Sequence, residues 1–266
     1  MSTEKLQYHH EILEIDNLVM TFGGLRAIDG VSMHIDEGEI AALIGPNGAR
    51  KTTIFNCITG VHKPTEGKVK IRNRDGRAEE IQGLKPNLIN LKGLARTFQN
   101  IRLFNNMTVL ENVMIGRHNS LKAGVFAAII RNAPTKEEEQ RVIEESYTIL
   151  KKLKLDAYVN EMAKNLPYGE QRRLEIARAL ATDPFLLLLD EPVAGMNAQE
   201  TKELEETINI IRDQEHITIL LIEHDMSLVM DVSERIYVLD YGKLIAEGSP
   251  HEIKKNPDVI KAYLGE

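Results

Sequence analysis

Short apolar runs separated by turn residues dominate the first part of the chain. Between residues 11 and 45 they are broken by Gly-Gly at 23–24, which predicts antiparallel strands joined by tight turns. The run Ile40–Ile44 ends at Gly45 and is typical of a short buried strand. The next segment, TTIFNCIT, predicts a short helix that stops at Gly60.

The middle of the chain follows a helical period instead. Thr108 with Glu111 and Thr135 with Glu138 both have the spacing of a capping box, in which two side chains close the start of a helix. Residues 105–165 are therefore expected to form a mostly helical insertion.

Strand patterns return in the last third. The runs FLLLL, ITILLI and RIYVL are continuous and apolar, as expected for strands buried on both faces of a parallel sheet. A helix over roughly 199–212 would join the first two of these strands into a βαβ unit. Residues 235–248 predict an edge hairpin, and the tail 250–266 predicts one or two short helices.

Composition narrows the class of protein. The chain has 266 residues, 42% of them hydrophobic, with 33 basic and 40 acidic side chains and a net charge of −7. The acidic balance argues against non-specific nucleic-acid binding. One cysteine excludes a disulfide scaffold, a multi-cysteine zinc site and a CxxC redox pair. The apolar runs are far shorter than a membrane span and the N-terminus lacks a signal-peptide core, so we expect a soluble α/β protein of a reducing compartment.

The segment GPNGARKTT is the strongest local signal for chemistry. It follows a predicted strand and opens a predicted helix, as a phosphate-binding loop does. Backbone N–H groups and the helix dipole would converge on the phosphates, Lys51 would add charge, and the Thr52 hydroxyl is placed for Mg²⁺. The predicted phosphate-binding residues are Gly45, Pro46, Asn47, Gly48, Ala49, Arg50, Lys51, Thr52 and Thr53.

Arg50 stands where the general pattern G-x-x-x-x-G-K-[ST] has its second glycine. Glycine beside a phosphate permits close backbone approach and unusual dihedral angles. A long side chain there could collide with nucleotide or with a partner surface, or its charge could lie along the phosphates. We hypothesise that ATP binding or turnover is impaired relative to an Arg50→Gly variant.

Polar residues follow the predicted strands at the edge where ligands bind in open α/β sheets. Asp190 could hold Mg²⁺ directly or through water, and Glu191 could accept a proton from an attacking water. These two carboxylates could instead cap the next helix. His224 follows the next strand at the same edge, although a lone histidine is more often structural, and Gln99 could join the metal shell or place water.

The segment LPYGEQRRLEIARAL joins a turn to a strongly helical stretch. The start of this helix is a second dipole that could face phosphate. The arginines Arg172, Arg173 and Arg178 could otherwise form an ordinary solvated face.

The order of these segments resembles the nucleotide-binding subunits of ABC transporters over nearly the full length. GPNGARKT resembles Walker A, ARTFQ the Q-loop, LPYGEQ the signature motif, LLLLDE Walker B, AGMN the D-loop and LIEHD the switch-histidine loop. FQNIRLFNNMTVLENVMIG and NPDVIKAYLGE are most similar to branched-chain amino acid importers, with urea and lipopolysaccharide transporters as close relatives. The resemblance implies an α/β P-loop NTPase (RecA-like) core with an antiparallel β subdomain and an inserted α-helical subdomain.

The resemblance also implies roles for individual residues. Phe22 is similar to the aromatic residue that stacks on adenine, although the family more often has tyrosine. Thr52, Gln99 and Asp190 would surround Mg²⁺. The implied catalytic residues are Glu191 as general base, His224 at the γ-phosphate, and Gln99.

The signature motif departs from the family pattern. Where the family has LSGGQ this chain has LPYGE, so Pro167 replaces a serine and one hydroxyl donor is absent. Gly169 keeps the position at which backbone meets phosphate. By resemblance, Tyr168, Gly169 and Glu170 would complete the ATP site of the opposite subunit in a head-to-tail dimer.

The resemblance implies one ABC ATPase domain over residues 1–266. Its expected parts are the β subdomain with the P-loop part of the core (1–100), the helical signature subdomain (101–168), the Walker B and switch part (169–248) and a C-terminal helical tail (249–266).

The expected partners are a second, related but different ATPase subunit, two integral membrane permeases contacted near residues 99–130, and indirectly a solute-binding protein. We expect the chain at the cytoplasmic face of the cell membrane as a peripheral subunit.

Three alternatives remain open from the sequence. An ABC-type ATPase of DNA repair or translation typically carries two cassettes or a long coiled-coil insertion, and neither pattern appears in this sequence. A kinase-like phosphate-loop enzyme would need an acceptor-pocket signature, which the sequence lacks. A non-enzymatic ATP-binding regulatory subunit is favoured by Arg50 but opposed by the retained Glu191 and His224.

Overall fold

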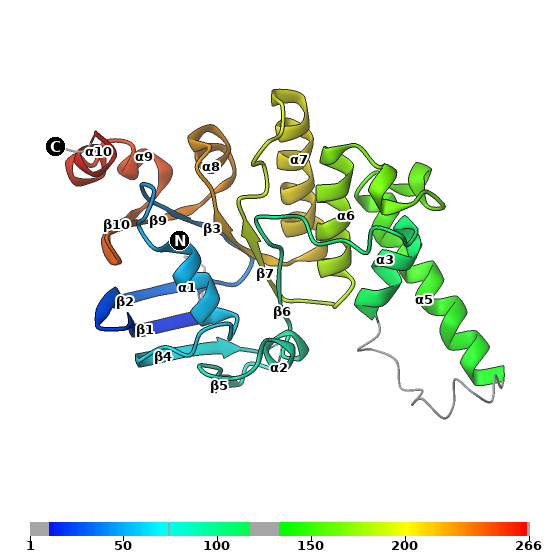
Figure 1. The fold of residues 1–266 in the computed structure, drawn as a ribbon, viewed down its shortest axis with the longest axis horizontal. Coiled ribbons are helices and arrows are strands. Elements are labelled where there is room, and N and C mark those ends of the chain that lie inside the picture. The colour runs from blue at the N-terminus through cyan, green and yellow to red at the C-terminus, as the bar shows by residue number, and fades with distance from the viewer. Residues whose placement is uncertain (1–10, 74, 118–132, 265–266) are drawn as a thin grey trace, which may run out of the picture.

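Two β-sheets carry the fold (Figure 1). The computed structural model describes residues 11–73, 75–117 and 133–264, and side-chain detail within the last segment starts at residue 137. One sheet has four antiparallel strands in the order β2-β1-β4-β5, and the other has six strands in the order β10-β9-β3-β8-β7-β6.

The antiparallel sheet begins with the predicted hairpin. Gly23 and Gly24 both have positive φ angles, of 51° and 89°, which suits the tight turn between the first two strands. The third and fourth strands, which the sequence analysis did not predict, extend the sheet from β1. Its strands are β1 (Glu11–Phe22), β2 (Leu25–Asp36), β4 (Glu66–Arg72) and β5 (Ala78–Glu80).

The six-stranded sheet confirms the predicted buried strands. All five residues of β3, β7 and β8 are buried, and these strands pair in parallel. The predicted hairpin at 235–248 is antiparallel and ends the sheet at β10. The strands are β3 (Ile40–Ile44), β6 (Leu94–Arg96), β7 (Leu186–Asp190), β8 (Thr218–Ile222), β9 (Arg235–Asp240) and β10 (Lys243–Gly248).

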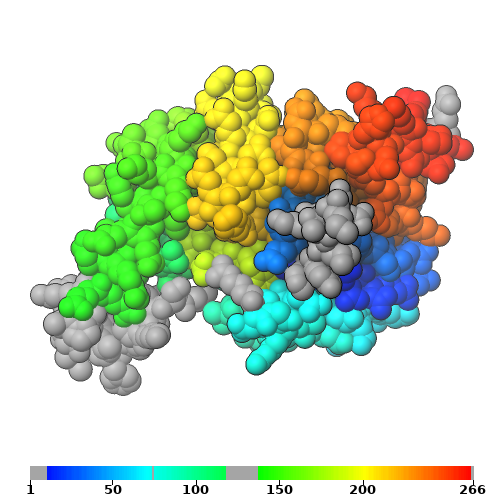
Figure 2. Space-filling view, turned by 180° about the vertical axis from the view of Figure 1, so that it is seen from behind, coloured from blue at the N-terminus to red at the C-terminus, as the bar shows by residue number. Residues whose placement is uncertain are grey.

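Helices flank this sheet, and α3, α5 and α6 gather at one end of the molecule (Figure 1). Figure 1 shows α3, α5 and α6 together at the end away from α10, and Figure 2 shows the same separation from behind. The helices are α1 (Lys51–Ile58), α2 (Pro86–Leu91), α3 (Val109–Gly116), α5 (Ala133–Lys152), α6 (Tyr168–Leu180), α7 (Ala198–Glu215), α8 (Met226–Val232), α9 (Pro250–Ile253) and α10 (Pro257–Leu264), with 3-10 turns at η2 (Asp156–Tyr158) and η3 (Ala163–Asn165).

Helix ends test the capping predictions directly. Thr108 and Glu111 form the predicted capping box at the start of α3. Gly60 follows α1 with a φ of 73°, as predicted for a helix stop. The prediction for Thr135 was wrong, because α5 begins at Ala133 and Thr135 therefore lies inside the helix rather than at its cap.

The core lies on both faces of the six-stranded sheet, because alternate side chains of a strand point to opposite faces. On β3, Ala41 and Leu43 belong to the cluster that contains Phe55 of α1, whereas Ile40 and Ala42 belong to the cluster of the other face. Each sheet strand is thus fixed from two sides, which holds the loops at its ends in place.

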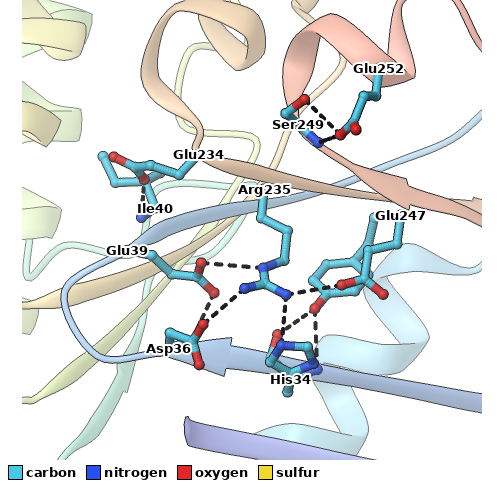
Figure 3. Close-up of polar contacts among 10 residues, drawn as sticks. His34, Asp36, Glu39, Ile40, Glu234, Arg235, Glu247, Ser249 and Glu252 are labelled. Atoms are coloured by element: carbon cyan, nitrogen blue, oxygen red, sulfur yellow. Dashed lines mark hydrogen bonds and ion pairs between the residues drawn. The ribbon is translucent and has the colours of Figure 1, made fainter. Parts of the chain in front are cut away.

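Arg235 ties the two sheets together at the starts of β3 and β9 (Figure 3). Its guanidinium contacts the carboxylates of Asp36 at 2.8 Å, Glu39 at 3.3 Å and Glu247 at 3.0 Å. It also lies 2.6 Å from the His34 ring nitrogen. This junction lies where β3 and β9 start. The loops described next lie at the opposite edge of the six-stranded sheet, where its parallel strands end.

Candidate nucleotide site

The candidate site lies at the carboxyl ends of β3, β7 and β8. These strands are neighbours in the sheet, in the order β3-β8-β7. The segments that follow them, 45–51, 191–197 and 223–225, therefore start along one edge. This is the edge at which open α/β sheets bind ligands.

The loop after β3 closes tightly on the sheet. Gly45 has a φ of 151°, and a Cβ added there would lie 2.0 Å from the backbone oxygen of Leu239. Gly48 also has a positive φ, of 84°, with nothing within 4 Å of an added Cβ. The loop leads into α1, whose N-terminal N–H groups make a site suited to phosphate.

Lys51 lies at the start of α1 and is 6% exposed. Its ammonium donates to the backbone oxygens of Gly45 at 2.7 Å and Pro46 at 3.3 Å. Burial lowers the pKa of Lys51 below 10.5, and the charges of Glu191 and Asp190 act in the opposite direction. The loop therefore holds a cation close to both carboxylates.

Arg50 adopts a glycine-like backbone conformation. It is the N-cap of α1, with φ 78° and ψ 22° in the left-handed region, and its side chain makes no capping hydrogen bond. Its backbone oxygen accepts from the Thr53 N–H at 3.0 Å. The left-handed region costs a residue with a Cβ about 1–2 kcal/mol, so the loop keeps its geometry at an energetic cost.

Asp190 ends β7 and is paired inside the protein. Its Oδ2 lies 2.7 Å from Nη2 of Arg96, and both side chains are buried. The same guanidinium donates to Asn56 at 2.8 Å and Thr59 at 3.1 Å on the side of α1, and lies 5.2 Å from the centre of the Phe98 ring. Sequence analysis missed Arg96; an arginine ending the apolar segment LAR was the available signal.

Glu191 lies between the two other predicted site residues. Its Oε2 accepts from Nε2 of Gln99 at 2.6 Å, and its Oε1 lies 2.8 Å from Nε2 of His224. Glu191 itself has a φ of 48°, in the left-handed region. The structure thus brings Gln99, Glu191 and His224 together, and this carboxylate is oriented by two side chains from separate loops.

Glu223 joins the loops after β7 and β8, and sequence analysis missed it. Its carboxylate accepts from the backbone N–H groups of Val193 at 2.9 Å, His224 at 2.8 Å and Asp225 at 3.2 Å. Burial raises the pKa of Glu223, against the effect of these hydrogen bonds. The segment LIEHD offered a signal, since a charge that directly follows a buried strand needs partners.

The signature segment contacts the loop that follows β7 and residues of α6 and α7. The Tyr168 hydroxyl donates to the backbone oxygen of Ala194 at 2.9 Å, and Glu170 pairs with Arg173 at 2.9 Å. The position of Gly169 lies close to the Glu200 side chain.

The alternative of a solvated arginine face is wrong for Arg172 and Arg173. Arg172 is 0% exposed and Arg173 is 7% exposed. Both are ion-paired in the interior, so they take part in the packing of α6.

Phe22 is the last residue of β1. Its ring is half-exposed and packs edge-on against His62, with 5.3 Å between ring centres. An exposed aromatic face of this kind could stack on a planar ligand.

The oxygen-rich residues fit a magnesium ion bound together with phosphates. Thr52 and Gln99 are exposed residues that carry a hydroxyl and an amide oxygen, and the buried Asp190 carries a carboxylate. Within the described residues there is no group of three or more His, Cys, Asp or Glu side chains that could hold a metal alone. Mg²⁺ typically uses one or two protein ligands and the substrate phosphates, which agrees with this arrangement.

Comparisons with known proteins identify the same family over most of the chain. Residues 28–194 match the ABC transporter family, and residues 243–266 match the family described as branched-chain amino acid ATP-binding cassette transporter. The chain is 48% identical to the high-affinity branched-chain amino acid transport ATP-binding protein LivG of Salmonella typhimurium, covering 96% of this chain and 98% of that protein. It is 46% identical to BraF of Pseudomonas aeruginosa, described in the same words, with the same coverage.

A solved structure agrees with this assignment. The ADP conformation of MJ1267, an ATP-binding cassette of an ABC transporter, has a TM-score of 0.82 and 34% identity, covering 96% of this chain and 99% of that one. The expected P-loop NTPase fold is therefore confirmed. No helix among the described residues is both long and apolar enough to span a bilayer. The chain belongs to the ABC transporter family, as one of its ATP-binding ATPase subunits.

Proposed function

We propose that this chain binds ATP with Mg²⁺ and hydrolyses it to drive import of branched-chain amino acids through separate permeases. The match of residues 243–266 and the names of the relatives support this solute over urea or lipopolysaccharide. The observation that carries the proposal is the position of Glu191, bound by Gln99 and His224 at the strand edge that also bears Lys51.

The phosphates of ATP would lie in the loop 45–53. Its N–H groups, the dipole of α1 and the Lys51 ammonium supply the positive potential that a triphosphate needs. Phe22, with its half-exposed ring, would stack on adenine. The residues that would hold Mg²⁺ are Thr52, Gln99 and Asp190, and the bound ion would neutralise phosphate charge.

Glu191 would act as the general base. Its two carboxylate oxygens are held by Gln99 and His224, so a proton leaving the attacking water would reach an oriented acceptor. His224 would also contact the γ-phosphate, and Gln99 would place the water.

The second subunit would face this site with its signature segment. Tyr168, Gly169 and Glu170 begin α6 and make their own-chain contacts outside the phosphate loop, which leaves them available to the opposite site of a head-to-tail dimer. The solved dimer of MJ0796 shows that a cassette of this fold dimerises. We propose a related but different chain as this partner.

The permeases would dock on a groove between α3, α6 and the loop after Gln99. It has a volume of about 430 Å³ and is lined by Arg102, Phe104, Ile115 and Arg178, among others. Phe104 and Ile115 are exposed there, as suits a protein partner. Such docking would hold the chain at the cytoplasmic face of the membrane, with a solute-binding protein as an indirect partner.

We further propose the subdomain boundaries set out above. Helices α3, α5 and the start of α6 would form the inserted unit around 101–168, and β7 to β10 would form the Walker B and switch part at 169–248. The tail 249–266 would contribute α9 and α10.

A regulatory subunit with impaired turnover is the second candidate. The left-handed backbone of Arg50 in the phosphate loop favours it. An importer ATPase and a regulatory subunit would both bind ATP, but only the importer ATPase would hydrolyse it rapidly. Assays of ATP binding and ATP hydrolysis therefore distinguish the two candidate functions.

The test compares Glu191→Gln with Glu206→Gln, a half-exposed surface carboxylate. If Glu191 is the base, Glu191→Gln retains ATP affinity but hydrolyses ATP at least about 100-fold more slowly, and the surface variant is unchanged. Leucine uptake in cells lacking the chain should be restored by the wild type and by Glu206→Gln, but not by Glu191→Gln. Restored urea uptake with unchanged leucine uptake would refute the proposed solute.

A further inference from the structure

The first two turns of α6 contact the loops that hold Glu191 and Gln99 in the same chain. The Tyr168 hydroxyl donates to Ala194, three residues after Glu191. Arg172, one helical turn later, extends to the loop that carries Gln99. The signature helix is therefore attached to both sides of its own candidate catalytic cluster.

Arg172 makes an unusual set of contacts for a fully buried cation. Its Nη1 donates to the backbone oxygen of Phe98 at 2.6 Å, and its Nη2 donates to that of Gln99 at 2.7 Å. Nη2 also lies 3.5 Å from the Tyr168 hydroxyl. One guanidinium thus holds two successive carbonyl groups of the Q-loop from the signature helix.

Glu175 supports this guanidinium from the next turn of α6. Its Oε2 lies 2.9 Å from Arg172 Nη1, and its Oε1 accepts from the Arg102 N–H at 3.2 Å. Both side chains of the pair are essentially inaccessible to water. A buried pair with these additional hydrogen bonds is rigid, because breaking it leaves charges without partners.

The contacts form a continuous chain from the signature segment to the proposed base. Arg172 fixes the backbone at Gln99, and the Gln99 side chain donates to Glu191 at 2.6 Å. In the proposed dimer the segment 168–170 faces the site of the other subunit. The same short helix end therefore contacts machinery of two different sites.

We propose that Arg172 is a positioning residue that makes Gln99 and the signature segment 168–170 move as one unit, and so links the two ATP sites of the dimer. The proposal rests on the proposed function, since it requires a second cassette. Arg172 acts through Gln99 and does not itself touch the reacting atoms.

Arg173 provides a matched control on the same helix. It is also buried, and it pairs with Glu170 at 2.9 Å and Glu203 at 3.2 Å, but its described contacts do not include the Q-loop. Arg172→Met and Arg173→Met each remove one buried guanidinium from α6. A merely structural effect would be shared by both, whereas the proposed linkage is specific to Arg172.

The first experiment measures amide hydrogen exchange of residues 98–104 in the full-length chain. Arg172→Met should speed exchange there at least tenfold, Arg172→Lys should fall between, and Arg173→Met should match the wild type. Equal exchange in Arg172→Met and Arg173→Met would overturn the proposal. This readout needs no turnover, so it is independent of any effect of Arg50.

The second experiment is a double-mutant cycle on ATP hydrolysis by the assembled complex, made with Arg50 and with Arg50→Gly. Arg172→Met should lower kcat about tenfold with Gln99 present and less than twofold in a Gln99→Ala background. An equal factor in both backgrounds would overturn the positioning role. Wild-type protein that neither binds nor hydrolyses ATP would instead refute the proposed function, while the exchange result would still report the Arg172 contact.

Discussion

Arg96 and Asp190 form an ion pair in the interior, with 2.7 Å between Nη2 and Oδ2 and side-chain exposures of 7% and 3%. Arg96 ends the short strand β6 and Asp190 ends its neighbour β7. The carboxylate proposed to hold Mg²⁺ is therefore oriented from the Q-loop side of the sheet. The same arginine contacts Asn56 and Thr59, which ties this carboxylate to α1 as well.

Replacing Arg96 by methionine should destabilise the protein strongly. Removing one partner of a buried pair leaves an uncompensated charge, which typically costs about 3–5 kcal/mol. Urea unfolding of Arg96→Met should show a loss of that size. The double variant Arg96→Met/Asp190→Asn should recover much of it, because the stranded charge is gone. Equal stability of the single and double variants would contradict this account.

The two glycines of the phosphate loop should respond differently to alanine. At Gly45 a Cβ would lie 2.0 Å from a backbone oxygen, so the β3 and β9 ends must separate. Gly48 has open space around its Cβ position, and its φ of 84° adds only the left-handed penalty of about 1–2 kcal/mol. Gly45→Ala should lower the melting temperature much more than Gly48→Ala. A similar shift for both would disprove the steric argument.

Glu223 should make stability depend on pH above 4.5. Burial raises its pKa in the folded chain above the ordinary value of 4.5, so the folded chain binds more protons than the unfolded chain just above that pH. The free energy of unfolding should then fall as pH rises through this window. Glu223→Gln cannot titrate and should show a smaller fall in urea unfolding between pH 5 and pH 7. Glu206→Gln, at an exposed pair, serves as the control and should keep the wild-type slope.

Local patterns were sufficient for most of the six-stranded sheet. The runs that form β3, β7, β8 and β9 are continuous and apolar, so burial on both faces could be predicted from the sequence. Strands β4 and β6 were not predicted. In β4, EGKVKIR, charged residues alternate with apolar ones, which is an available signal of a half-buried strand. Strand β6 has only three residues, so its pairing with the distant strand β7 decides it.

In the candidate site, too, residues with a local sequence signal were predicted and residues that depend on distant partners were not. Glu191, Gln99 and His224 were predicted because each belongs to a motif or follows a strand. Arg96 and Arg172 were not assigned a role at the site, because their partners lie 94 and 74 residues away and only the fold brings them together. Buried contacts of this kind, an ion pair for Arg96 and hydrogen bonds to backbone oxygens for Arg172, depend on long-range packing, which a single sequence does not specify.

Substitutions of Arg50 test whether its side chain or its left-handed backbone conformation impairs ATP binding and hydrolysis. Arg50→Gly should remove the left-handed penalty of about 1–2 kcal/mol, less about 0.5–1 kcal/mol of glycine entropy, and so stabilise the chain slightly. We expect ATP affinity and hydrolysis to rise about fivefold or more, because the side chain no longer lies at the phosphate loop. Arg50→Ala retains the Cβ but not the guanidinium, so a gain in Arg50→Ala would assign the impairment to the charge or bulk of the side chain. A gain in Arg50→Gly alone would assign it to the backbone, and equal ATP binding and turnover in wild type and Arg50→Gly would refute an impairment by Arg50.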